Sequence, residues 1–138
     1  MKATADLAQP PEHLFSFLCD LRNHWRLSPE FVEVERVDGD GDGARIRIVG
    51  PLGLARRART RIVEEREPDL LRGVADVGRR TEGAVTWRLE PHGGGTRVTL
   101  AAEVVAAAWW DRLMLALGGR LWLQRGLRQA VRRLGELA

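Results

Sequence analysis

A pair of alternating segments around a glycine-rich turn constrains the fold of this chain more than any other feature. Apolar residues take every second position in both segments: Val85, Trp87 and Leu89 in the first, and Val98, Leu100, Ala102 and Val104 in the second. A period of two is typical of antiparallel strands with one buried face. Pro91 and the glycines at 93–95 supply the turn. We therefore predict a long, half-buried β-hairpin over residues 83–105.

The rest of the chain separates into short strands and three helical segments. Strands are predicted over residues 2–8, 31–37, 44–49, 54–66, 70–77, 83–90 and 96–105. A helix opens at Pro10-Pro11, a second short one is capped by Asp20 and ends at Ser28-Pro29, and a long one spans about 109–137. Consecutive strands with helices kept apart indicate an α+β fold, β-α-α-β6-α, with the helices on one face of the sheet. The length and the absence of a linker predict one domain, residues 1–138.

The predicted closing helix carries two apolar stripes that face different directions. The change falls after Gly118-Gly119, where a glycine pair can kink a helix. One interpretation is that the two halves pack on different parts of a curved sheet. The other is a flexible joint beside a pocket. The sequence favours the first, because glycine inside a helix also serves close packing.

Composition excludes several classes of protein. The formal net charge is +3. Although Arg57, Arg59 and Arg61 crowd one strand, Glu33 and Glu35 are expected on a neighbouring strand, so we predict no nucleic-acid partner. No apolar run reaches the ~18 residues of a membrane span. The polar N-terminus and a single cysteine are typical of a cytoplasmic protein.

The sequence contains no pattern that predicts a metal site or a cofactor. Residues 38–43 alternate Asp and Gly as calcium loops do, but Val49 stands where an EF-hand needs its bidentate glutamate. We interpret the segment as a hairpin turn. The three histidines are scattered, without metal-ligand spacing.

The chain resembles the START-like (SRPBCC, Bet v 1-like) superfamily, in particular its polyketide cyclase/dehydrase branch. The resemblance lies in the opening strand with 10–15, the segment 20–25 leading to Phe31, the hairpin with Trp87 and the long last helix. It implies a helix-grip fold, in which a bent seven-stranded antiparallel sheet wraps around the last helix and encloses an apolar cavity. Because this fold carries many unrelated functions, the resemblance points less clearly to an activity.

Within that fold we predict binding of a small apolar or aromatic molecule. The expected lining consists of Trp25, Phe31, Val85, Trp87, Leu100, Leu113 and Leu117. The alternative is an aromatase/cyclase-like enzyme, for which the acid/base candidates are His24, Arg72 and Asp76. A third interpretation is an interaction protein that uses the tryptophans of the last helix, and an exposed tryptophan there leaves a homodimer open.

Overall fold

The computed structural model describes residues 1–27, 32–37, 43–49, 55–78, 80–106, 112–113, 116 and 120–138. The strands are β1 (Lys2–Leu7), β2 (Val32–Val37), β3 (Gly43–Val49), β4 (Ala55–Arg66), β5 (Leu70–Val77), β6 (Thr81–His92) and β7 (Gly95–Ala106). The helices are α1 (Pro11–Leu18), α2 (Leu21–Leu27) and α4 (Arg120–Leu137). Residues 38–42 of the turn predicted over 38–43 and the glycine pair 118–119 lie outside the described residues, while Gly43 begins β3.

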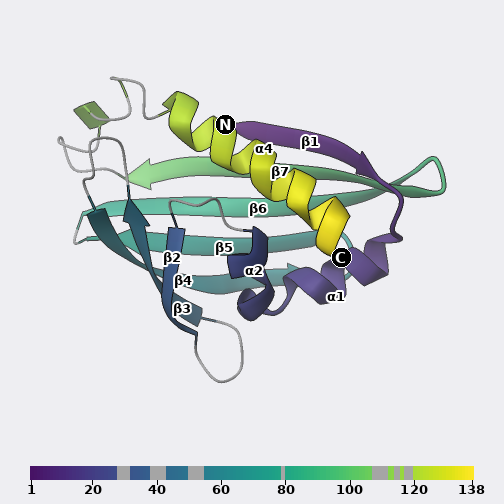
Figure 1. Ribbon diagram of the computed structural model, residues 1–138, viewed down its shortest axis with the longest axis horizontal. Helices are drawn as coiled ribbons and strands as arrows, with labels where there is room; N and C mark the ends of the chain where they lie inside the picture. The colour runs from purple at the N-terminus through teal and green to yellow at the C-terminus, as the bar shows by residue number, and fades with distance from the viewer. Residues whose placement is uncertain are drawn as a thin grey trace.

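The strands form one antiparallel seven-stranded sheet in the order β1-β7-β6-β5-β4-β3-β2. The sheet is bent, and α1, α2 and α4 lie on the same face of it (Figure 1). This confirms the predicted α+β helix-grip fold, including its consecutive strands and helices kept to one face. The two edge strands are β1 and β2.

The hairpin predicted over residues 83–105 forms β6 and β7, and it is longer than the alternation alone predicted. The two strands pair from Glu82↔Ala106 to His92↔Gly95, with a register shift between Glu82 and Gly83. Gly93 and Gly94 form the turn with φ of 56° and 84°, which is backbone conformation that glycine adopts without steric cost. The ends of β6 extend beyond the alternating segment: Thr81 pairs with β5, and residues 82, 91 and 92 pair with β7, through backbone positions that the side-chain pattern does not reveal.

The pairing register divides the sheet into two faces. Residues directly opposite each other in a ladder share a face, so Leu71, Trp87 and Leu100 point together toward the helices. We call this the concave face and the other the convex face. Its core is completed by α1 and α4. The buried cluster contains Ala3, Leu14, Phe15, Leu18, Leu27, Leu71, Trp87, Leu89, Val98, Leu100, Ala130, Val131 and Leu134.

One residue, Gln9, links three parts of the fold through its side chain and its backbone. Its amide Nε2 donates to the carbonyl oxygens of Gly135 (2.8 Å) and Ala138 (3.0 Å) at the end of α4. Its own backbone carbonyl accepts a hydrogen bond from the hydroxyl of the fully buried Thr96 (2.7 Å). The end of a helix leaves carbonyls without intrahelical partners, so Gln9 satisfies two of them.

Candidate functional site

The concave face changes character along the strands. Near α1 and α4 it is closed, because Trp87 and Leu100 are only 4% and 2% exposed. Toward β3 and the far ends of β4–β6, small and branched apolar side chains stay half-buried: Ile46, Ile48, Ile62, Ala75, Val77 and Val85. We call these six residues the apolar strip. It gives the concave face a partly solvent-accessible apolar surface beside a sealed core.

The register places the apolar strip on one continuous surface. Val85 lies opposite Gly73, which lies opposite Ile62, in a row across three strands. A second row runs from Val77 to Ala58 and on to Ile46. Ile62 and Val85 pack against the buried core. A ligand held here would therefore rest on the core at one end and on apolar side chains along its length.

The predicted lining residues fall into four groups: core, apolar strip, exposed, and not described. Trp87 and Leu100 are core, and Val85 belongs to the apolar strip. Leu113 is 41% exposed. Trp25 lies on α2, in a helix where the structure leaves its side chain undescribed, while Phe31 and Leu117 lie outside the described residues. The structure thus brings together Val85, Trp87 and Leu100 as neighbours on β6 and β7.

His24 is held inside the helix–sheet junction. Its Nε2 lies 2.6 Å from the carbonyl oxygen of Leu18, an acceptor, so this nitrogen carries a proton and donates. Its ring meets the indole of Trp87 edge-on. Burial lowers the pKa of His24 below its ordinary value of 6.5, against the opposing effects of the Leu18 carbonyl and the Asp20 carboxylate. A neutral, hydrogen-bonded ring packed on Trp87 fixes α2 to the core.

The other two acid/base candidates lie on the opposite side of the sheet. Arg72 faces Thr86 and Asp76 faces Glu82 across the β5–β6 ladder. These positions alternate with Leu71, Gly73, Ala75 and Val77, which are the concave positions of the same strand. Arg72 and Asp76 are therefore convex-face residues, separated from the apolar strip by the sheet.

Sequence reasoning missed one charged residue of the concave face. Arg56 pairs with Ile48 in the β3–β4 ladder, so it shares its face with Ala58 and the apolar strip. Its Nη2 lies 2.9 Å from the position that a Cβ on Gly78 would take, at the end of β5. The sequence contains the signal for this position, because strand alternation places residue 56 on the opposite face from 57, 59 and 61. Arg56 is half-buried there and can orient a polar group of a ligand.

The remaining arginines of β4 point to the convex face. Arg57 forms an ion pair with Glu35 (Nε to Oε1, 3.3 Å), and Arg47 on β3 forms one with Glu33 (Nη1 to Oε2, 3.3 Å). The neighbouring acidic strand expected from the sequence therefore neutralises part of this surface. Among the described residues, no three His, Cys, Asp or Glu side chains are close enough to hold a metal ion.

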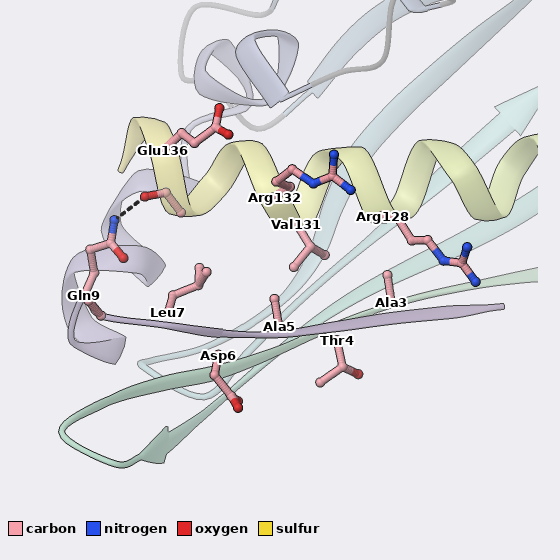
Figure 2. Close-up of a pocket in the computed structure, with 12 residues that line it drawn as sticks. Ala3, Thr4, Ala5, Asp6, Leu7, Gln9, Arg128, Val131, Arg132 and Glu136 are labelled. Atoms are coloured by element: carbon pink, nitrogen blue, oxygen red, sulfur yellow. Dashed lines mark hydrogen bonds between the residues drawn. The ribbon is translucent and has the colours of Figure 1, made fainter.

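A second concavity runs between β1 and α4 (Figure 2). It has a volume of about 550 Å³ and is lined by Ala3, Thr4, Ala5, Asp6, Leu7, Ala8, Gln9, Arg128, Val131, Arg132, Gly135 and Glu136. We call it the β1–α4 groove. Ala3, Ala5 and Leu7 rise from β1 toward the helix, whereas Thr4 and Asp6 point the other way. Leu7 meets α4 where Gly135 leaves room, since a Cβ there would lie 2.7 Å from Leu7 Cδ2.

The whole sequence, residues 1–138, matches the profile of the family described as polyketide cyclase/dehydrase and lipid transport. The chain belongs to this family. Polyketide cyclase/dehydrase family membership agrees with the START-like resemblance of the sequence and with the bent sheet around α4. Among curated proteins, none matches the sequence.

Several solved structures superpose on nearly the entire chain. A protein of Thermus thermophilus is 21% identical and superposes with a TM-score of 0.71, over 99% of this chain and 94% of that one. A protein of Mycobacterium smegmatis is 19% identical, with a TM-score of 0.69 over 99% and 88%. The AHSA1 protein of Silicibacter pomeroyi is 18% identical, with a TM-score of 0.67 over 99% and 94%. At these identities the likeness concerns the fold.

None of the described helices combines the length and the apolarity that a bilayer-crossing helix needs.

Proposed function

We propose that this protein binds a small, mostly apolar or aromatic molecule on the concave face of its sheet, without transforming it. The observation that carries the proposal is the apolar strip, a patch of aliphatic side chains left half-buried beside a sealed core. When a ligand covers apolar surface that was exposed to water, the free energy of binding becomes more favourable by about 25 cal/mol per Å² of surface buried. The family description, which includes lipid transport, supports the same ligand class.

The strip also indicates how a ligand would be oriented. Trp87 closes the end toward the core, and Arg56 with the hydroxyl of Thr60 supplies polar groups on the same face. A ligand whose apolar body extends along the strip from Val85 to Val77 would direct a polar substituent toward Arg56, whose Nη2 lies beside Gly78. In most small-molecule sites, apolar contact supplies affinity while a few polar groups fix the orientation.

Cyclisation of a polyketide chain is the alternative that the family name raises. It requires a positioned acid/base group next to the ligand. Of the three candidates, His24 donates its Nε2 proton in a hydrogen bond to the Leu18 carbonyl, and Arg72 and Asp76 lie on the convex face. These placements favour binding over catalysis. The tryptophans at 109 and 110 lie outside the described residues, so the interaction-protein alternative gains no support from them.

Titration with N-phenyl-1-naphthylamine, an uncharged aromatic fluorophore, tests the proposal. We expect saturable binding that weakens at least ~10-fold in Val85→Glu, because a buried carboxylate opposes an apolar ligand. Thr86→Glu is the matched control, since residue 86 occupies the convex face of the same strand. Equal binding by both variants would overturn the proposed site. Incubation with a reactive poly-β-keto thioester, followed by product analysis, addresses catalysis, and an altered product profile that requires His24 would replace binding with cyclisation.

A further inference from the structure

The strand β1 is an edge strand whose outer backbone groups point away from the sheet. Met1 and Ala102 exchange two backbone hydrogen bonds, of 3.2 and 2.9 Å. In an antiparallel ladder such bonded pairs recur every second residue, and the residues between them turn their N–H and C=O groups outward. Met1, Ala3, Ala5 and Leu7 are therefore the bonded positions that face β7. The residues between them, Lys2, Thr4 and Asp6, turn their backbone groups outward.

The helix α4 runs beside this edge. Gln124 donates its side-chain N–H to the outward carbonyl of Lys2. On a helix, residues four apart lie on one row, so Arg128 and Arg132 continue the row that Gln124 begins. Both arginines are exposed, and both line the β1–α4 groove together with Thr4 and Asp6. Within the described part of the chain, neither arginine forms an ion pair.

The strand and the helix stay in step along the groove. From Gln124 to Gly135 the helix advances about 16–17 Å at 1.5 Å per residue. From Lys2 to Leu7 the strand advances about the same distance at 3.3 Å per residue. Contacts occur at both ends of this match, Gln124 with Lys2 and Gly135 with Leu7. The outward groups of Thr4 therefore lie level with Arg128, and those of Asp6 lie nearly level with Arg132.

One wall of the groove thus offers backbone hydrogen-bonding groups, and the other offers guanidinium groups with almost the same repeat. Arginines four residues apart are separated by about 6 Å along a helix. Side chains on one face of a strand are separated by about 6.7 Å. The Asp6 carboxylate does not neutralise these arginines, because it accepts hydrogen bonds from Arg97 on the convex face. Glu136 lies at the far end of the groove.

We propose that β1 accepts an extended acidic segment of a partner protein as an eighth strand. The backbone of the segment would pair with the outward groups of Thr4 and Asp6, which is the mode called strand addition. Acidic side chains at alternate positions would pair with Arg128 and Arg132, since guanidinium and carboxylate match in charge and shape. Gln124 contacts the start of β1, and Gln9, just beyond the end of β1, is bonded to the end of α4, so the open edge between them admits an ordered segment of about four residues.

The test is fluorescence anisotropy with a labelled hexapeptide of alternating glutamate and valine. We expect saturable binding that falls at least ~10-fold in the double variant Arg128→Glu/Arg132→Glu, because two attractive charge pairs become repulsive. The double variant Arg120→Glu/Arg125→Glu is the matched control, with the same charge change on exposed positions of α4 outside the groove. An equal loss in both double variants would overturn the proposal, because it would reduce the effect to net charge.

Hydrogen exchange separates strand addition from simple electrostatic attraction. The proposal predicts that bound peptide slows hydrogen exchange of the Thr4 and Asp6 amides. It also predicts that binding requires the backbone N–H groups of the peptide. A peptide methylated at alternate backbone nitrogens should therefore bind at least ~10-fold more weakly when the methylated face is the paired one. Unprotected Thr4 and Asp6 amides would contradict the proposal. Concentration-dependent pairing of β1 with a second copy, or equally strong binding of a DNA oligonucleotide, would also overturn it.

Discussion

The imidazole ring of His24 meets the indole of Trp87 edge-on, with ring centroids 6.2 Å apart and ring planes at 86°. Edge-to-face contact is a preferred geometry of aromatic pairs. The same imidazole donates to the Leu18 carbonyl at the end of α1. His24 therefore links α1, α2 and the sheet through one neutral ring, and its protonation should weaken that link.

Stability should decrease as the pH is lowered because of His24. Burial lowers its pKa in the folded state, so the unfolded chain binds the proton more readily. The contribution is complete above pH 6.5 and is lost as the pH falls through the lower folded pKa. Urea unfolding measured from pH 7.5 downward should show this decline, and His24→Gln should remove it.

His13→Gln serves as the control for that experiment, because His13 is exposed on α1. Its pH dependence should match the parent protein. The lowered pKa of Asp6, caused chiefly by its hydrogen bond with Arg97, adds a separate loss at lower pH, below the carboxyl's ordinary value of 3.8. A decline near pH 6 that persists in His24→Gln would show that another group is responsible.

Truncation of Trp87 should be among the most costly changes in the chain. The side chain is 4% exposed and lies between Leu71 and Leu100 in the ladders. Trp87→Ala should reduce the free energy of unfolding by about 3–5 kcal/mol, the range for deleting a large buried aromatic. Leu121→Ala is the matched control, because Leu121 is 74% exposed and should change stability by less than about 0.5 kcal/mol. A loss below about 1 kcal/mol for Trp87→Ala would contradict the assignment of Trp87 to the core.

Gly95 should tolerate no side chain. A Cβ at this position would overlap the Leu7 carbonyl oxygen and lie 3.1 Å from the Ala8 Cα. Backbone cannot move aside as a flexible side chain can, so Gly95→Ala should cost at least about 1–3 kcal/mol in thermal unfolding. Gly83→Ala is the comparison, since its nearest neighbour, the Glu103 oxygen, is 3.4 Å away. Similar melting temperatures for the two variants would contradict this account of the β1–β7 junction.

The clamp made by Gln9 gives a prediction about α4. Gln9→Ala removes two hydrogen bonds to the Gly135 and Ala138 carbonyls and should cost about 1–3 kcal/mol. Gln9→Glu should cost more, because a carboxylate repels the carbonyl end of a helix. Amide exchange in the last turn of α4 would report the loosening. Equal stability of the two variants would mean that the carbonyls find water instead.

The fold could be predicted because its signals are local and repeated. Alternation in β6 and β7 fixes a half-buried hairpin, and Pro11 with Leu14 and Leu18 marks the first helix. The same pleat separates Arg57 from Ala58 and so assigns the two faces of β4. These features depend on residues close in the chain, which is why the sequence shows them.

The candidate site was less predictable because it depends on how distant segments meet. The half-burial of Ile46 on β3 and Val77 on β5 depends on how segments distant in the chain pack on the sheet, which no local pattern specifies. The β1–α4 groove depends on the contacts of Gln9 and Gln124 across more than a hundred residues. The inward position of Arg56 was available from strand alternation, but the cluster of arginines around it concealed it.

The central claim is that the apolar strip is a ligand surface, and methyl-labelled NMR tests it most directly. With isotope-labelled Ile, Leu and Val methyls and 1-naphthol as the ligand, intermolecular nuclear Overhauser effects report which side chains touch it. The account predicts contacts from naphthol protons to the methyls of Ile46, Ile62 and Val85, on the concave face. Contacts confined to exposed methyls such as Val105 and Leu121, or to Leu7 and Val131 of the groove, would contradict it.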